Sequence, residues 1–145
     1  MNIKSTTASL IFVILLSACI KNQNPEQQII GNHKLNVQFI SDVPGHITVI
    51  KTNDSLLMNG ETWSNDSSAS MRINGYLTNI FPDSFTFTGN IKITSMGCCG
   101  NIDKNNIWTF RKMEERVFYR LKERDSLCSC DTCCYYVDIT PINQN

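Results

Sequence analysis

The stretch 85–94, FTFTGNIKIT, alternates apolar and polar residues and is rich in aromatic and β-branched side chains. Successive side chains of a β-strand point to opposite faces, so this two-residue period is typical of a strand with one buried face. Gly89-Asn90 interrupts the alternation. The stretch therefore predicts either one bent strand or a hairpin.

The same period occurs upstream of this stretch. The run 35–39, LNVQF, alternates, and Pro44-Gly45 then turns the chain into the run 46–50, HITVI. Farther along, Asn59-Gly60 and Asn74-Gly75 each stand among strand-like residues. Because Asn-Gly tolerates the positive φ angles of a tight two-residue turn, we expect both pairs to be the turns of hairpins.

The C-terminal third supplies the last predicted strands. The runs 107–110, IWTF, and 117–121, VFYRL, are expected to pair across residues 113–116. A helix over 111–124 is the competing interpretation because the stretch is highly charged, but the period of two favours strands. A final strand is predicted over 135–140, YYVDIT. About eight short strands and no clear helix indicate an all-β fold, a small antiparallel sandwich or barrel.

The N-terminus has the order of a secretory signal. Lys4 supplies one positive charge ahead of the apolar run 8–16, ASLIFVILL. This run is far shorter than the roughly 20 residues that a membrane-spanning helix needs. Residues 1–18 are therefore predicted to be a cleaved export signal.

Residues 16–19, Leu-Ser-Ala-Cys, end this segment with an apolar residue, two small residues and a cysteine. The motif resembles the lipobox of bacterial lipoproteins, and the resemblance covers residues 1–19. It implies cleavage before Cys19, a diacylglyceryl thioether on that cysteine, and usually an acyl chain such as palmitate on its amine. Two or three acyl chains hold a protein on a membrane, whereas one chain binds only marginally. An ordinary secretory signal that contains a cysteine is the alternative.

The resemblance also implies a location in the cell envelope. Enteric lipoproteins with aspartate after the lipidated cysteine tend to stay in the inner membrane, and here that position is Ile20. The outer membrane is therefore favoured, with the domain facing the periplasm, and the inner membrane stays open.

The length of the chain suits a single domain. Removing residues 1–18 from 145 leaves 127 residues, enough for one ordinary core. We expect residues 19–33 to be the lipidated Cys19 and a flexible polar tether, and residues 34–145 to be one β-rich domain. The charges nearly balance, which gives no support for binding nucleic acid, a function that needs clustered positive charge. The oligomeric state stays open.

Six cysteines follow Cys19: Cys98, Cys99, Cys128, Cys130, Cys133 and Cys134. An even number in an exported chain is typical of a disulfide framework. Bonds between adjacent cysteines need a strained ring, and excluding them leaves ten of the fifteen pairings. In all ten, Cys98 and Cys99 each bond to the C-terminal group. The predicted hairpin over 107–122 would bring the two groups to the same end.

The competing interpretation of these cysteines is metal or redox chemistry. Cys128-Ser129-Cys130 and Cys130-Asp131-Thr132-Cys133 have spacings that could hold zinc or copper, or a redox pair. An oxidising compartment disfavours free thiols, so we prefer structural disulfides and predict no resident metal or cofactor.

The remaining polar residues form no catalytic constellation in the sequence. His33 and His46 are the only histidines, lack a ligand or triad spacing, and are expected to be solvated or in turns. Turn capping is expected of the aspartates that stand beside turn-forming residues: Asp42, Asp54, Asp66 and Asp83.

Two groups of residues could form a recognition surface. The aromatic candidates are Trp63, Trp108, Phe110, Tyr135 and Tyr136. Aromatic side chains dominate binding hot spots, but on alternating strands they are more often core. The mixed charges between Arg111 and Asp125 suit a solvated face, and this is where we would first look for a binding partner.

The leading hypothesis is a membrane-anchored, non-enzymatic envelope lipoprotein that binds or inhibits another envelope protein. Metal handling in the envelope through the cysteine cluster is the alternative. A hydrolase whose residues meet only in the folded chain is a third class, and it would need a pocket that joins a histidine to a carboxylate.

Overall fold

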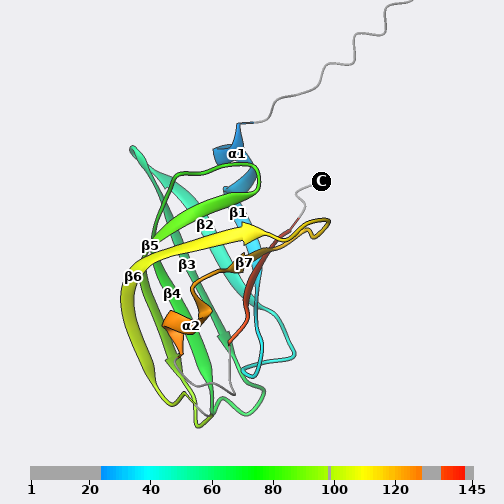
Figure 1. Cartoon of the computed structure of the whole chain (residues 1–145), viewed down its shortest axis with the longest axis vertical. Helices are drawn as coiled ribbons and strands as arrows, with labels where there is room; N and C mark the ends of the chain where they lie inside the picture. Colours follow the sequence, from blue (N-terminus) through cyan, green and yellow to red (C-terminus); the bar gives the residue numbers. More distant parts are fainter. Residues whose placement is uncertain (1–23, 98, 129–134, 143–145) are drawn as a thin grey trace, which may run out of the picture.

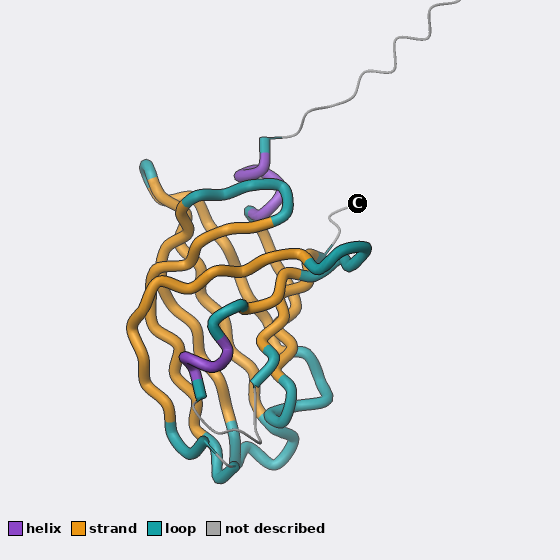
Figure 2. The backbone as a smooth tube through the Cα atoms, viewed as in Figure 1, coloured by secondary structure: helices purple, strands orange, loops and turns teal. Residues whose placement is uncertain are grey.

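A computed structural model describes residues 24–97, 99–128 and 135–142. In these residues each strand pairs with the next along the chain, and the last pairs with the first, which closes an antiparallel up-and-down barrel (Figures 1 and 2). The strands are β1 (Gly31–Val37), β2 (Gly45–Thr52), β3 (Ser55–Trp63), β4 (Ser70–Thr78), β5 (Ser84–Thr94), β6 (Ile102–Lys112), β7 (Tyr119–Leu121) and β8 (Val137–Pro141). The all-β prediction is confirmed, as a barrel.

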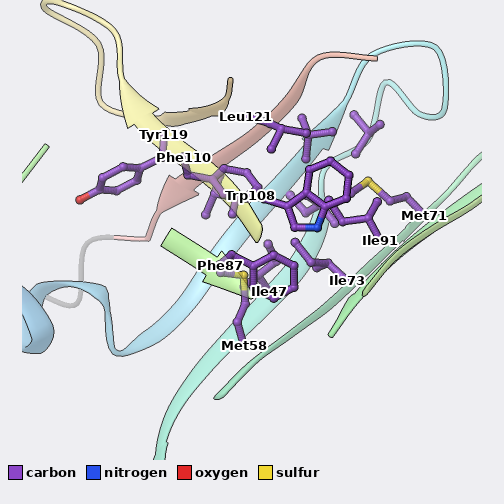
Figure 3. Packing of buried hydrophobic residues seen from close by; sticks show 14 of the residues in the cluster. Ile47, Met58, Met71, Ile73, Phe87, Ile91, Trp108, Phe110, Tyr119 and Leu121 are labelled. Carbon is purple, nitrogen blue, oxygen red and sulfur yellow. The ribbon is translucent and has the colours of Figure 1, made fainter. Parts of the chain in front are cut away.

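The core fills the interior of the barrel. Most inward positions along the strands are apolar and buried, with His33 of β1 and Thr62 of β3 as buried polar residues. Figure 3 shows side chains such as Trp108, Phe87 and Met58 in this interior. The Phe85 ring stacks on the Phe110 ring with centroids 5.2 Å apart. An eight-stranded barrel is just wide enough for side chains to fill. The two-residue period of the sequence therefore separates core from surface along most of the strand positions, whereas residues 103–107 of β6 are all exposed.

The two Asn-Gly pairs are not turns, so the hairpin prediction for them was wrong. Asn59-Gly60 lies inside β3 and Asn74-Gly75 inside β4. Gly89-Asn90 lies inside β5, which is a single strand, so the stretch 85–94 is not a hairpin.

Close packing between neighbouring strands explains why these mid-strand positions are glycine. A Cβ on Gly75 would lie 2.3 Å from the carbonyl oxygen of Thr88 and 2.7 Å from the Phe87 ring. Gly89 faces Gly75 across the sheet, and its carbonyl accepts a hydrogen bond of 3.1 Å from Trp108 Nε1. Glycine within a strand often marks such a close approach. Gly60 is packed in the same way, since a Cβ there would lie 2.3 Å from the Ile47 side chain. At both pairs the glycine takes an inward position of its strand, and the asparagine takes the neighbouring outward one.

Asn-Asp segments supply the actual turns. Asn53 and Asp54 link β2 to β3, with Asn53 at a φ of 45°. Between β3 and β4, Asp66 Oδ1 accepts hydrogen bonds of 2.7 Å from the hydroxyls of both Ser64 and Ser68. These bonds lower the pKa of Asp66 to about 2. The turn-capping role predicted for Asp66 is confirmed.

The hairpin predicted in the C-terminal third is confirmed. β6 and β7 pair with Phe110 opposite Leu121, and no helix forms over 111–124. β7 is short, and the edge of β6 beyond it is covered differently: Glu123 Oε2 accepts a hydrogen bond of 2.7 Å from the backbone N–H of Thr109. The chain then enters α2 (Arg124–Leu127).

Within the described residues, regular structure is present from Pro25, ahead of the expected domain start at Lys34. Residues Pro25–Ile29 form the helix α1, which is capped where Asn24 Oδ1 accepts a hydrogen bond from the Glu26 N–H. His33 is buried in β1 at 2 % exposure, and its Nε2 donates to the carbonyl of Ile29 at 2.7 Å. The predictions of a tether over these residues and of a solvated His33 were therefore wrong.

His46 is exposed. Within the described residues, neither α1 nor α2 has the length and apolar character needed to cross a membrane.

Replacing Gly75 by alanine should destabilise the barrel by about 1–3 kcal/mol, because the added methyl group overpacks the contact between β4 and β5. Urea unfolding of the domain measures this as a lower midpoint. The matched control is Gly97→Ala, where the nearest atom to the new Cβ is the Ser95 hydroxyl at 3.1 Å. Equal losses of stability in the Gly75→Ala and Gly97→Ala variants would contradict this explanation of the mid-strand glycine.

His33 should make stability depend on pH. Burial lowers its pKa below the ordinary value of 6.5, although the hydrogen bond to Ile29 partly opposes the shift. The unfolded chain therefore binds a proton more readily, and the free energy of unfolding should fall as the pH drops from about 7 to about 5. Urea unfolding across this range should show a shallower dependence for His33→Gln. Parallel curves for the native protein and the variant would rule His33 out as the source.

Candidate functional site

Beside β7, three arginines and two aromatic rings contact one another on the outer surface of the barrel. In order of contact, this arginine–aromatic cluster is Arg124, Tyr136, Arg120, Phe118 and Arg116. The guanidinium carbon of Arg120 lies 4.5 Å from the centroid of the Tyr136 ring and 5.1 Å from that of Phe118. Arg124 lies 5.0 Å from the Tyr136 ring, and Arg116 lies 5.6 Å from the Phe118 ring. All of these distances fall within the roughly 6 Å over which a cation is attracted to a ring face.

The period of two along β7 and β8 places the cluster outside the barrel. Tyr119 and Leu121 are buried, so Phe118 and Arg120 face outward. The same alternation before β8 leaves Tyr136 half-buried on the outer side. Because β7 and β8 are antiparallel neighbours, the outward residues of these two segments meet.

Asp138 fixes the central arginine of the cluster. The Nε and Nη2 atoms of Arg120 donate to the two carboxylate oxygens of Asp138, each at 2.7 Å. This paired bond raises the pKa of Arg120, and burial opposes the rise. Bidentate pairs of this kind are the stronger and more directional ones. Arg120 is thus held between the two rings with its charge balanced by Asp138.

The outer members of the cluster are more accessible. Arg116 is exposed, and the Arg124 side chain is 40 % exposed and lies 3.7 Å from the carboxylate of Asp125. Lys122, in the same segment, is also exposed. All members except Tyr136 come from the stretch 111–125, which the sequence marked as the first place to look for a partner. The cluster therefore presents donors of hydrogen bonds beside ring surface.

Comparison with protein-family models identifies the family of this chain. The model of the PM1083 family matches residues 17–141, a range that contains the whole barrel and the cluster. The chain belongs to the PM1083 family. Comparisons with curated proteins and with solved structures found no match.

In this member of the PM1083 family, a disulfide joins Cys99 to Cys128, with their Cα atoms 5.8 Å apart. It links the loop between β5 and β6 to the end of α2. For Cys99, the prediction of a bond to the C-terminal cysteines is confirmed. The four other cysteines of the predicted framework lie outside the described residues: Cys98, Cys130, Cys133 and Cys134. Among the residues that the structure describes, no group of three or more His, Cys, Asp or Glu side chains could hold a metal ion.

The disulfide also helps to position Arg124. Lys104 Nζ of β6 donates to the carbonyls of Ser126 at 2.6 Å and Leu127 at 3.4 Å. Cys128 follows α2 directly and is 4 % exposed. Two links therefore hold the end of α2 against β6 and the loop before it. This fixes the helix that carries Arg124 to the cluster.

The aromatic residues marked in the sequence fall into two groups. Trp108, Phe110 and Tyr135 are fully buried, as expected of core residues. Tyr136 belongs to the cluster, and Trp63 is 43 % exposed with the Arg72 guanidinium 5.2 Å from its ring. The sequence reasoning did not single out Phe118 as a surface residue. The alternation around Tyr119 and Leu121 was the signal that could have found it.

A groove on the outside of β2, β3 and β4 brings a histidine near a carboxylate. It has a volume of about 380 Å³ and is lined by His46, Glu61 and Arg72, among others. The Glu61 carboxylate lies 3.3 Å from Arg72 Nε, and the hydroxyl of Thr48 in the same groove donates to Asn32 Oδ1 at 3.0 Å. The carboxylate and the hydroxyl are thus each engaged by a residue other than His46.

Removing the disulfide through the double substitution Cys99→Ser and Cys128→Ser should lower the free energy of unfolding by about 3–4 kcal/mol, because the bond closes a loop of roughly 30 residues in the unfolded chain. Urea unfolding without reductant measures the loss. Ser126→Ala is the control, since it changes α2 but keeps the bond and the backbone carbonyl that accepts from Lys104. A double variant as stable as the control would show that the bond contributes nothing.

Proposed function

We propose that this chain is a membrane-anchored envelope lipoprotein that binds another envelope protein, as a partner or an inhibitor, and catalyses no reaction. The observation that carries the binding role is the arginine–aromatic cluster. Arginine and tyrosine are enriched among the residues that contribute most to protein interfaces. The proposed anchor is lipid on Cys19. The outer membrane is favoured because the residue after Cys19 is Ile20 and not aspartate.

The geometry of the cluster suits a partner segment that carries carboxylates beside an apolar or aromatic side chain. Arg116 and Arg124 offer guanidinium donors at the two ends, and Phe118 and Tyr136 offer ring surface between them. Carboxylates are the natural partners of a guanidinium, which can hold them through two hydrogen bonds.

The paired bond to Asp138 supports binding in a second way. Arg120 is already fixed between the rings before any partner arrives. Side chains ordered in advance lose less conformational entropy on binding, so more of the contact energy remains as affinity.

The metal-handling alternative is weakened by the disulfide. Cys99 and Cys128 are bonded to each other, which removes two of the six thiols that this alternative could use. A sulfur in a disulfide is not the thiolate that binds zinc or copper.

Site-specific photocrosslinking in intact cells tests the binding role. A photoreactive amino acid at Lys122, which is exposed beside the cluster, should give a discrete crosslinked species. The same amino acid at Asn105, which is exposed on β6, is the matched control and should not.

The captured protein is then purified and its affinity for the domain is measured. The double substitution Arg116→Glu and Arg124→Glu should weaken binding at least about tenfold, because it reverses two charges at hot-spot positions. Lys92→Glu, on the outer face of β5, is the control for the change in charge. The absence of a crosslink specific to Lys122, or equal affinities for the variant and the control, would overturn the proposal.

A further inference from the structure

One rim of the barrel lies at the end where the proposed tether enters. Strand directions place at this rim α1, the turn of Asn53 and Asp54, the loop 79–83 and the loop 113–118. We call it the anchor-side rim. Figure 2 shows α1 and the loop 79–83 together at one end of the barrel. The opposite end carries the loops 38–44, 64–69 and 95–101.

The chain between the proposed lipid and this rim is short. Asn24 already caps α1, and only four residues lie between it and Cys19, which makes five residue-to-residue steps. A fully extended chain spans at most about 3.6 Å per residue, so the start of α1 lies within roughly 18 Å of the lipid-bearing residue. The proposed tether is thus much shorter than the tether over residues 19–33 that the sequence predicted.

Several apolar side chains of the anchor-side rim are open to solvent. Val117 is 73 % exposed, Phe81 57 % and Met113 50 %. Met113 and Val117 are flanked by Lys112 at the end of β6 and by Glu114, Glu115 and Arg116 in the loop, and the formal charges of these four residues cancel. An apolar surface edged with balanced charge suits the interface of a largely zwitterionic bilayer, where apolar residues reach toward the acyl chains and cations meet phosphates.

We propose that the anchor-side rim rests on the membrane, with Phe81, Met113 and Val117 in contact with lipid. This inference rests on the proposed lipidation of Cys19. The opposite end also exposes apolar residues, such as Met96 at 94 %, so exposure alone does not choose between the two ends. The short tether favours the anchor-side rim over the opposite end. It keeps the anchor-side rim at a high effective concentration near the bilayer, where a weak contact is sufficient.

The orientation has a consequence for the arginine–aromatic cluster. Arg116 lies in the loop at the anchor-side rim, and the cluster continues along the side of the barrel through Arg120 to Arg124. The cluster therefore extends away from the lipid surface. A partner that covers all of it must reach the domain close to the membrane.

The test uses the lipidated protein from cells, reconstituted in vesicles of phosphatidylethanolamine and phosphatidylglycerol. A photoreactive amino acid replaces Val117 in one variant and Met96 in the other, which is the control at the opposite end. After irradiation, mass spectrometry measures lipid adducts at each position. Adducts at Val117 should exceed those at Met96 by at least about tenfold.

The same spectra report the mass of the N-terminal peptide, which separates the two claims. Lipid on Cys19 with equal or absent adducts at the two positions would overturn the membrane contact and leave the lipoprotein proposal standing. An N-terminal peptide without lipid would overturn both. Introducing Phe81→Asp into the Val117 variant supplies a further check, since it should reduce the adducts while Cys19 stays lipidated.

Discussion

The pairing of β1 with β8 is the interaction on which the rest of the structure depends. Leu35 lies opposite Ile139, and Val37 lies opposite Val137. A meander of strands without this pairing would have two open edges and a core exposed on one side. Closure joins segments about a hundred residues apart, and the entropy cost of closing so long a loop is offset only when the interior is filled. The rings around Trp108 are therefore as necessary to closure as the hydrogen bonds are.

The backbone hydrogen-bond ladder is short at β7, and side-chain bonds and the disulfide hold the neighbouring segment there. β7 contributes only Tyr119–Leu121, so β6 continues past it without a strand partner on that side. The carboxylate of Glu123, the Lys104 bonds to α2 and the Cys99–Cys128 disulfide hold the adjoining segment in place. Arg120 and Asp138 bridge β7 to β8 through their side chains as well. The arginine–aromatic cluster thus lies on a part of the barrel that several side-chain links stabilise.

Features that depend on neighbouring residues in the sequence were predicted correctly. Features that depend on residues distant in the sequence were not. Alternation identified the β6 and β7 hairpin, and the exclusion of adjacent bonds identified the partner group of Cys99. Asn74-Gly75 was misread because its turn preference is local, whereas its role depends on Phe87 and Gly89 in the next strand. The burial of His33 depends on α1, a helix too short to show any period. The neighbours in the cluster depend on the pairing of β7 with β8, which no local pattern reports.

Asp138 connects the fold to the proposed site. It lies opposite Asn36 of β1 and opposite Arg120 of β7, so it belongs to the closing strand while its carboxylate holds the centre of the cluster. Loss of the β1–β8 pairing would leave β8 held only by its short ladder with β7, through Tyr119 and Arg120. Any later separation of β8 from β7 would take Asp138 and Tyr136 away from Arg120 together. Arg120 would then lose the carboxylate that balances its charge, and Tyr136 would lose the cation on its ring. The closed barrel therefore supports the cluster by holding β8 from both sides.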